Sequence, residues 1–326
     1  MTQTAFPVFD LGRFEQASGA ERQSLAASVD AICRTTGFLA IRNHGVPRET
    51  IDAVWNAVRA FFDLPAGEKH AVGAPYKGYP YGYLGPETEA LARSRGVESP
   101  PDLKESFNGG PLRVPAGLTD PQALAFCYAE TLWPEKPAGF EAAWRAYYGA
   151  LEDLAARIMR LFAAALKLPE DHFDRYIDAP VSALRALNYP EQHVAPQPGQ
   201  IRAGAHTDYG SLTILLPQPG SRGLEIMTPD GWTPVPPEPD AFVINIGDLM
   251  ALWTNDRWVS TLHRVVNPPV GEGGMDRRQS LAFFHQPNWD AEIRVLDACL
   301  TPDEAPKYAP VRSGPYLMGK FTATTK

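Results

Sequence analysis

The sequence predicts a mainly β protein with flanking helices, in which helical segments come first and short antiparallel strands follow. After Pro180 the chain shows short apolar or alternating runs separated by glycine, proline, asparagine and aspartate, a pattern typical of strands joined by turns. Between residues 140 and 168, apolar side chains recur at spacings of four and three, which predicts one long amphipathic helix. Numerous short strands favour a sandwich or jelly roll, whose double sheet can enclose a ligand cavity.

Residues 1–120 are predicted to form an N-terminal helical and loop region. Pro7 to Asp10 indicates a short strand, and apolar residues from Leu25 to Cys33 recur at helical spacing. A strand over residues 37–45 and a second amphipathic helix over residues 51–62 follow. We therefore expect this region to begin with alternating strands and helices.

The next stretch, residues 73–121, is dense in glycine, proline and tyrosine, which favours long ordered loops over a surface or a pocket mouth. Residues 121–326 are predicted to form the β core together with the long helix over residues 139–168. Within that core, residues 217–239 are rich in proline, so we expect them to be mostly loop. The long helix is expected to support a sheet from outside.

Composition narrows the classes of partner. With 326 residues and a formal net charge of -8, the chain lacks the basic balance that phosphate backbones require, so nucleic acid is not an expected partner. Residues 1–15 include Asp10, Arg13 and Glu15 and so lack the apolar core of a signal peptide. No stretch approaches the ~20 apolar residues of a membrane-spanning helix, and three widely spaced cysteines suggest no disulfide framework. We predict a cytoplasmic protein that acts on a small molecule, without nucleic-acid or membrane partners; its oligomeric state is not predicted.

Two histidines and an aspartate form a candidate metal site. His206 and Asp208 are separated by one residue, and in an extended segment alternate side chains point to the same side. His263 lies in a later predicted strand, residues 260–266. Two imidazoles and one carboxylate form a facial triad that suits iron(II), because three cis positions stay open for other ligands. The sequence thus predicts an open iron site at His206, Asp208 and His263.

Arg278 and Ser280 form a candidate carboxylate site. They are also separated by one residue, so they share one face of an extended strand. A guanidinium offers planar, charge-assisted donors and the serine adds a hydroxyl, a combination that suits the far end of a dicarboxylate. We expect this pair to anchor a cosubstrate.

The order and spacing of these pieces give the chain a family resemblance. The matching segments are residues 38–46, Asp102-Leu-Lys-Glu-Ser-Phe107, Ala205-His-Thr-Asp-Tyr-Gly-Ser-Leu-Thr213, Asn245-Ile-Gly-Asp248, Ser260-Thr-Leu-His-Arg-Val265 and Arg278-Gln-Ser280. The chain resembles the iron(II)- and 2-oxoglutarate-dependent dioxygenase superfamily, in the branch of isopenicillin N synthase, over nearly its whole length. The resemblance implies a double-stranded β-helix, the distorted jelly roll of that family.

The resemblance also implies a site and a reaction. Iron would bind His206, Asp208 and His263, and 2-oxoglutarate would bind Arg278 and Ser280 with Tyr189 at its keto-acid end. With O2 as the second cosubstrate, such enzymes oxidise a substrate C–H bond, most often by hydroxylation, and release succinate and CO2. Leu187 stands where plant relatives commonly place an asparagine, so the chain departs from those relatives on the strand that carries Tyr189.

Several further residues are candidates for the substrate pocket. Arg185, Leu187 and Tyr189 should share one face of the strand over residues 183–190, so that Arg185 points into the cavity and Leu187 forms an apolar wall. Tyr81 and Tyr83 either line the cavity or fasten their loop to the body. Strict alternation from Ser280 turns His285 away from the pocket, whereas a β-bulge would bring it in.

Three alternatives to this assignment remain open at this point. In an oxidase of the isopenicillin N synthase type, the Arg-x-Ser pair holds a substrate carboxylate and no 2-oxoglutarate is consumed. The fold could also serve as a binding module without turnover, or hold zinc for hydrolysis, because a fold does not fix a function. The aspartate in the triad favours iron over zinc, since catalytic zinc more often has three histidines or two histidines and a glutamate.

Overall fold

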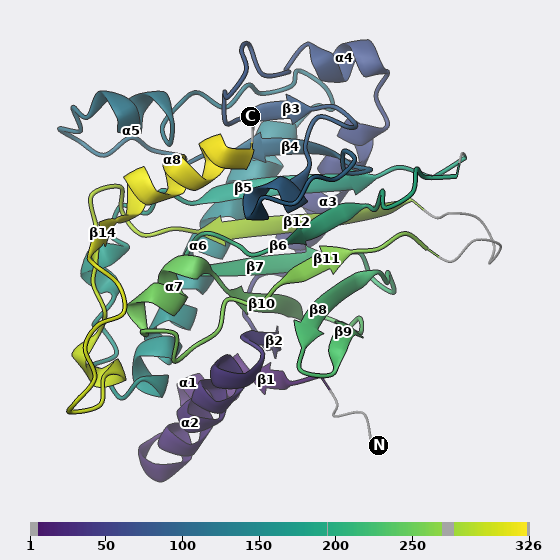
Figure 1. The fold of residues 1–326 in the computed structure, drawn as a ribbon. Coiled ribbons are helices and arrows are strands. Elements are labelled where there is room, and N and C mark those ends of the chain that lie inside the picture. Colours follow the sequence, from purple (N-terminus) through teal and green to yellow (C-terminus); the bar gives the residue numbers. More distant parts are fainter. Residues whose placement is uncertain (1–5, 194, 269–276, 325–326) are drawn as a thin grey trace.

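Two β-sheets with helices on their outer side make up the structure, a computed structural model that describes residues 6–193, 195–268 and 277–324 (Figure 1). The larger sheet has eight strands and the smaller one has four, and a separate pair of short strands lies near the C-terminus. This arrangement is the mainly β, distorted jelly-roll architecture, a double-stranded β-helix with added strands and helices, that the sequence predicts.

The helices are α1 (Leu11–Gln16), α2 (Gly19–Thr35), α3 (Arg48–Phe62), α4 (Ala66–His70), α5 (Pro121–Ala125), α6 (Phe140–Ala165), α7 (Asp248–Trp253) and α8 (Ser313–Thr324), with short 3-10 helices η1 (Leu91–Arg95), η2 (Asp174–Tyr176) and η3 (Asp297–Cys299). The strands are β1 (Val8–Asp10), β2 (Phe38–Arg42), β3 (Gly82–Leu84), β4 (Glu105–Gly109), β5 (Ala183–Tyr189), β6 (Ala203–His206), β7 (Leu212–Pro217), β8 (Leu224–Thr228), β9 (Gly231–Pro234), β10 (Phe242–Ile246), β11 (His263–Val265), β12 (Arg278–His285), β13 (Glu292–Ile293) and β14 (Val311–Arg312).

The large sheet mixes strands from the two ends of the chain. Its order is β1-β2-β10-β7-β12-β5-β4-β3, so the four N-terminal strands occupy both edges while the later strands fill the centre. Strands β1 and β2 pair in parallel, and the other neighbours in this sheet are antiparallel. Residues on both sides of position 120 therefore share one sheet, and the division of the chain into residues 1–120 and 121–326 stays a prediction.

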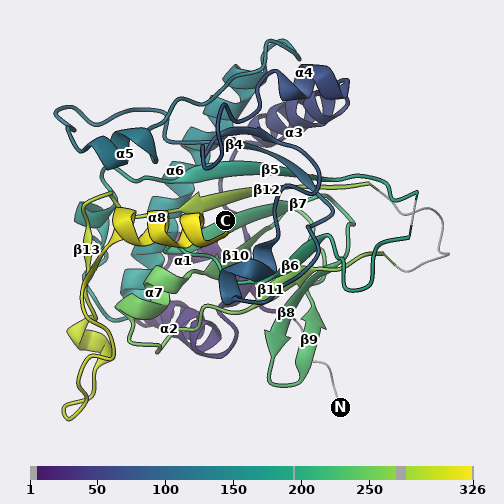
Figure 2. The same ribbon diagram turned by 45° about the horizontal axis from the view of Figure 1, so that its top comes forward.

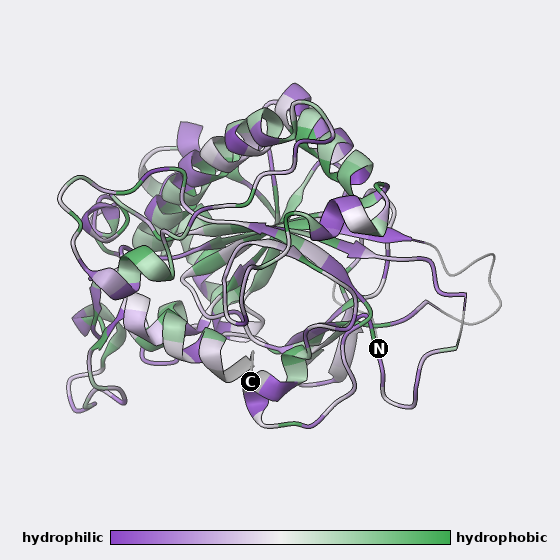
Figure 3. Cartoon of the chain, turned by 90° about the horizontal axis from the view of Figure 1, so that it is seen from above, coloured by the Kyte–Doolittle hydropathy of each residue, from purple (hydrophilic) through white to green (hydrophobic). Residues whose placement is uncertain are grey.

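Helix α6 supports the large sheet from its outer side. Its buried face packs on β7 and β12, while α2 and α3 pack against it in turn, and Figure 3 shows these helices gathered on one side of the sheet. The helix was expected over residues 139–168 and ends at Ala165, because Lys167 adopts a left-handed conformation with φ of 61° that a helix cannot continue. Burial of this face holds the helix in place and stiffens the central strands.

The small sheet corrects one expectation. Residues 217–239 were expected to be mostly loop, but they contain the hairpin of β8 and β9. Leu224 and Ile226 alternate with less buried residues along β8, and Gly231 takes φ of 100° just after the turn. The prolines obscured this pattern because Pro229 lies in the turn, Pro234 ends β9, and the others lie before and after the hairpin. Strand β8 pairs with β11, so the hairpin completes a sheet of order β6-β11-β8-β9.

Gly210 and Gly247 allow the two backbone segments that contain them to approach each other closely. A Cβ atom on Gly247 would lie 2.2 Å from the carbonyl oxygen of Gly210, and one on Gly210 would lie 2.5 Å from the carbonyl oxygen of His285. The contact is fastened by hydrogen bonds from Gly247 N to Ser211 O (3.1 Å) and from Asp248 N to Asp208 O (2.7 Å). Both motifs that carry these glycines therefore need them for space rather than for conformational freedom.

We predict that Gly247→Ala lowers the free energy of unfolding by about 1–3 kcal/mol, because the added methyl group must push two backbones apart. Gly149→Ala is the matched control: Gly149 lies inside α6 with no atom within 4 Å of a built Cβ, so that variant should gain about 0.5–1 kcal/mol. Urea unfolding of both variants measures the difference. Equal stability of the two proteins would contradict the packing argument.

Candidate active site

The two histidines of the predicted triad are brought together by strand pairing. His206 ends β6 and His263 begins β11, and the two residues lie opposite each other in the antiparallel ladder. Their ring centroids are 4.3 Å apart. Asp208 follows two residues after His206, and its Oδ1 lies 3.8 Å from Nε2 of His206 and 3.7 Å from Nε2 of His263. One ligand atom from each residue lies within 4.8 Å of the others.

Backbone carbonyls set the orientation of both rings. Nδ1 of His206 lies 2.7 Å from the carbonyl oxygen of Gly204, and Nδ1 of His263 lies 3.1 Å from that of Thr261. A carbonyl oxygen only accepts hydrogen bonds, so each Nδ1 carries the proton and donates it. Each Nε2 then keeps a free lone pair that faces Asp208, which is the arrangement found in metal-binding histidines.

Asp208 is held by two donors on one of its oxygens. Its Oδ2 accepts hydrogen bonds from the hydroxyl of Thr213 on β7 (2.5 Å) and from the amide of Asn245 on β10 (2.7 Å), which leaves Oδ1 to face the histidines. Thr213 and Asn245 lie in segments that the family resemblance covers, but sequence reasoning gave them no role. The pairing of β7 with β10, which places Asn245 opposite Thr213, reveals it.

The charges of the triad favour a bound cation. Burial and the neighbouring His263 lower the pKa of His206 to about 3, so its ring is neutral and available as a ligand. Burial by itself would raise the pKa of Asp208, but the two histidines and the donors Thr213 and Asn245 bring it below its ordinary value. The site therefore presents the Nε2 atoms of both histidines and one carboxylate oxygen to a common point.

Arg278 presents a buried positive charge with few partners. The residue is 3% exposed, its Nη1 lies 3.4 Å from the hydroxyl of Ser280, and its Nε has no hydrogen-bond partner among the described residues. It lies opposite Tyr189 in the pairing of β12 with β5, with Cζ 5.1 Å from the centre of the tyrosine ring. Burial lowers the pKa of Arg278, although Tyr189 opposes this shift. Within residues 6–193, 195–268 and 277–324, no carboxylate forms an ion pair with this guanidinium, so its buried charge is uncompensated there.

The triad and Arg278 line the same cavity, which lies between the two sheets and has a volume of about 200 Å³. Strands of the large sheet contribute Tyr189, Arg278 and Ser280, and the small sheet contributes the two histidines. The arrangement of the donors fits the groups that the sequence suggests: the triad matches an octahedral cation with open positions, and the guanidinium matches a carboxylate.

Three of the predicted pocket residues line this cavity. Leu187 lies on the cavity face of β5 next to Arg185, and Tyr81 reaches the cavity from the loop before β3. Arg185 is already engaged, since its Nε donates to Oδ1 of Asn108 (2.7 Å) and its Nη atoms lie 3.2 and 3.3 Å from Glu89. Tyr81 both lines the cavity and fastens its loop, because its hydroxyl donates to the carbonyl of Cys127 (2.6 Å).

Two other candidates lie outside the cavity. Tyr83 points to the outer side of the large sheet, where its hydroxyl donates to Glu105 and its ring packs against Phe61; its proximity to Tyr81 in sequence was misleading because only Tyr81 reaches the cavity. His285 is buried and bonds through Nδ1 to the hydroxyl of Ser211 (2.7 Å). The pairing of β12 with β7 runs in regular register from Ser280 to His285, so His285 follows strict alternation away from the cavity.

Sequence reasoning missed other residues that line the cavity. Phe284 and Gln286 line the cavity from the end of β12, and Leu317 and Phe321 line it from α8. Helix α8 contacts η1. Figure 2 shows α8 crossing the front of the molecule. The alternation that excludes His285 could have found Phe284. The sequence did not indicate a role for the α8 residues, because the pattern of a short helix does not show which of its faces meets a cavity formed by distant segments.

A buried facial triad beside an incompletely paired guanidinium is typical of mononuclear iron oxygenases that use a keto-acid cosubstrate. Comparison with known proteins agrees: residues 181–287 match the family model of the 2OG-Fe(II) oxygenase superfamily, and residues 6–136 match that of the non-haem dioxygenase in morphine synthesis N-terminal region. The chain belongs to the 2OG-Fe(II) oxygenase superfamily.

Individual relatives cover nearly the whole chain. The 2-oxoglutarate-Fe(II) type oxidoreductase hxnY of Emericella nidulans is 32% identical over 98% of this chain and 90% of its own length. The 2-oxoglutarate-dependent dioxygenase caaD of Aspergillus niger is 34% identical over 87% of this chain and 85% of its own. A full-length Neurospora crassa protein, crystallised in complex with alpha-KG and thymine, superposes with a TM-score of 0.85 at 29% identity, covering 98% of this chain and 96% of that one.

The protein is therefore an iron(II)- and 2-oxoglutarate-dependent dioxygenase that uses O2 to oxidise a C–H bond of a small molecule, with release of succinate and CO2. Among the described residues, no helix is both long enough and apolar enough to cross a membrane.

We predict that Asp208→Ala abolishes turnover and metal binding while the fold remains, because the triad loses its only anionic oxygen. Anaerobic titration with iron(II) and circular dichroism measure the two properties. Asp208→Glu should also lose most of its activity, since the longer side chain displaces the oxygen by about an ångström. Wild-type turnover in Asp208→Ala would rule out this triad as the metal site.

A second prediction concerns Asn245, which orients Asp208. Asn245→Ala should lower the affinity for iron(II) about ten- to a hundredfold, the usual cost of removing a group that holds a metal ligand. Asn188→Ala is the control, because Asn188 is equally buried and donates to a carboxylate, Glu105 (2.6 Å), away from the triad. Comparable losses of affinity in both variants would show that the effect is not specific to Asp208.

Proposed function

We propose that His206, Asp208 and His263 hold the iron(II) ion of this dioxygenase, and that Arg278 and Ser280 bind the distal carboxylate of 2-oxoglutarate. The observation that carries the proposal is the buried, incompletely paired guanidinium of Arg278 in the same cavity as the triad. Leaving such a charge uncompensated is costly, so an anionic ligand that reaches it gains charge-assisted hydrogen bonds without displacing a protein partner.

Tyr189 is proposed to contact the same ligand. It lies opposite Arg278 in the sheet and lines the cavity, so its ring can pack against the chain of 2-oxoglutarate. Leu187, next along the same face, supplies an apolar surface instead of the amide common in plant relatives. We infer that Tyr189 and the strand register, rather than a side-chain amide, orient the cosubstrate here.

The primary substrate is proposed to be a small molecule that enters beside the triad. Phe284, Leu317 and Phe321 offer apolar surface there, and Arg185 and Tyr81 add polar side chains to the wall, each already hydrogen-bonded to another part of the chain. Thymine in the related Neurospora crassa crystal structure supports a substrate of modest size. Hydroxylation is the outcome we propose. A cytoplasmic location, and the absence of nucleic-acid or membrane partners, stay predictions from the sequence.

The chain's own residues prepare the site for this reaction. When bound, iron(II) and 2-oxoglutarate supply the oxidising chemistry. The contribution of the protein is to exclude water, to place one C–H bond of the substrate near the metal and to orient the rings of His206 and His263 through their Nδ1 contacts with backbone carbonyls.

We predict that Arg278→Lys weakens binding of 2-oxoglutarate about ten- to a hundredfold, because the substitution keeps the charge but loses the fork of donors, at a cost of roughly 1.5–3 kcal/mol. Affinity for iron(II) should barely change. Anaerobic titration with 2-oxoglutarate measures the first quantity, and the ratio of succinate formed to substrate consumed should be near one in the wild type.

The outcome that contradicts this assignment is specific. If Arg278 held the primary substrate, as in an oxidase of the isopenicillin N synthase type, the wild type would turn over without any keto acid. The variant would then weaken binding of that substrate and leave 2-oxoglutarate binding unchanged.

A further inference from the structure

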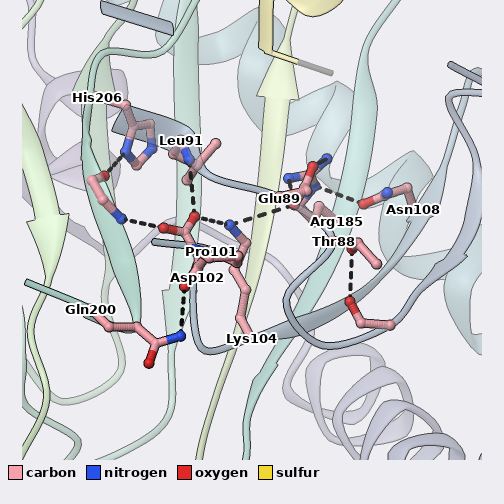
Figure 4. Close-up of polar contacts among 12 residues, drawn as sticks. Thr88, Glu89, Leu91, Pro101, Asp102, Lys104, Asn108, Arg185, Gln200 and His206 are labelled. Atoms are coloured by element: carbon pink, nitrogen blue, oxygen red, sulfur yellow. Dashed lines mark hydrogen bonds and ion pairs between the residues drawn. The ribbon is translucent and has the colours of Figure 1, made fainter. Parts of the chain in front are cut away.

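A buried network of charges lies beside the triad, and its members Asp102, Lys104 and Glu89 have no role in the function described above. Asp102 and Lys104, just before β4, are 2% and 3% exposed. Nζ of Lys104 lies 2.6 Å from Oδ2 of Asp102 and 3.5 Å from Glu89, and Glu89 in turn pairs with Arg185 at the cavity wall. Figure 4 shows this chain of contacts running from Arg185 towards His206.

The network of buried charges reaches the backbone of β6, the strand that ends at His206. Strand β6 is an edge strand of the small sheet, so one row of its backbone groups has no neighbouring strand to pair with. At Gly204 both groups are satisfied by side chains: its N–H donates to Oδ1 of Asp102 (2.9 Å) and its carbonyl accepts from Nδ1 of His206 (2.7 Å). Asp102 and the imidazole of His206 thus form hydrogen bonds with the same residue, Gly204.

Neighbouring atoms also pack closely against Gly204. A Cβ atom on Gly204 would lie 2.9 Å from the backbone nitrogen of Ala92 and 3.3 Å from Oδ1 of Asp102, so η1 and Asp102 both press against the strand. Oδ2 of Asp102 also accepts from the backbone nitrogen of Leu91 (3.2 Å). One carboxylate therefore joins η1 to β6 directly behind a proposed metal ligand.

We propose that Asp102 and Lys104 are positioning residues for His206: the Asp102 carboxylate fixes the Gly204 backbone, which fixes the tautomer and ring direction of His206, and Lys104 holds that carboxylate in place through its 2.6 Å contact. The inference rests on the proposed role of His206 as an iron ligand. Burial by itself would lower the pKa of Lys104, but Glu89 and Asp102 outweigh burial and raise that pKa. The buried lysine is therefore charged.

The adjacent residue of the same motif provides a matched control. Glu105 is 4% exposed, and strand alternation turns it to the outer side of the sheet, where it accepts from Lys69 (2.8 Å), Asn188 (2.6 Å) and the hydroxyl of Tyr83. It equals Asp102 in burial and in the number of its partners, but none of those partners lies on β6. A role that is only structural should make the two carboxylates equivalent.

The experiment compares Asp102→Ala, Asp102→Asn and Glu105→Gln with the wild type in the full chain. Cobalt(II) affinity is measured by anaerobic titration, and the ring signals of the histidines are measured by NMR on zinc(II)-loaded, 15N-histidine-labelled protein. Asp102→Ala should lose cobalt(II) affinity about ten- to a hundredfold, and the Nδ1–H signal of His206 should broaden or shift while that of His263 stays. Asp102→Asn keeps an oxygen that accepts from Gly204 and should lose less, and it replaces the alanine variant if the latter does not fold.

Glu105→Gln should keep cobalt(II) affinity within about twofold of the wild type and leave both histidine signals unchanged. Wild-type affinity and ring signals in both Asp102 variants would overturn the inference, and so would an equal loss in Glu105→Gln. Asp208→Ala separates this from the proposed function: if Asp208→Ala binds cobalt(II) as the wild type does, the metal site itself is misassigned, whereas if only the Asp102 variants are unaffected, the positioning role alone fails.

Discussion

The register between β6 and β11 is the constraint on which the site depends. Pairing of His206 with His263 places two imidazoles on one face of the small sheet, and Asp208 joins them only because the chain leaves β6 two residues later. A slip of one residue would turn either histidine to the opposite face. The hairpin of β8 and β9 pairs with β11 on its other side, so the register is held from two directions.

The loop that carries Asp208 is fixed by contacts with the large sheet. Thr213 and Asn245 come from neighbouring strands of that sheet and hold one carboxylate oxygen, and Gly210 and Gly247 let the two backbones meet. The side chains proposed to bind the metal are thus on the small sheet and its loop, while the groups that orient the carboxylate are on the large sheet. The segments around Asp208 and Asn245 are therefore adjacent in space although they are far apart in the sequence.

The sequence predicted the elements whose signals are local. The periodicity of α6, the His-x-Asp triplet and the Arg-x-Ser pair depend on spacings of a few residues, and strand alternation placed Leu187 and Tyr189 on the face that the structure shows. Pairing between strands that lie far apart in the chain was not accessible, so the roles of Thr213 and Asn245 were missed. Tyr81 and Tyr83 show the same limit, since Tyr81 precedes β3 and Gly82, with φ of 89°, breaks the alternation that would place both tyrosines on one face. The hairpin of β8 and β9 was hidden because proline content outweighed a short alternating pattern.

Arg278 belongs to the large sheet, whereas His206 and His263 belong to the small one. A 2-oxoglutarate molecule held at both places acts as a non-covalent cross-link between the two layers of the protein. Because only the folded chain brings those layers face to face, the bound metabolite adds its binding free energy to the stability of the fold. If 2-oxoglutarate binds as proposed, the resistance of this enzyme to heat and to proteolysis would rise with the concentration of 2-oxoglutarate, and a reactant would also contribute to the stability of the fold.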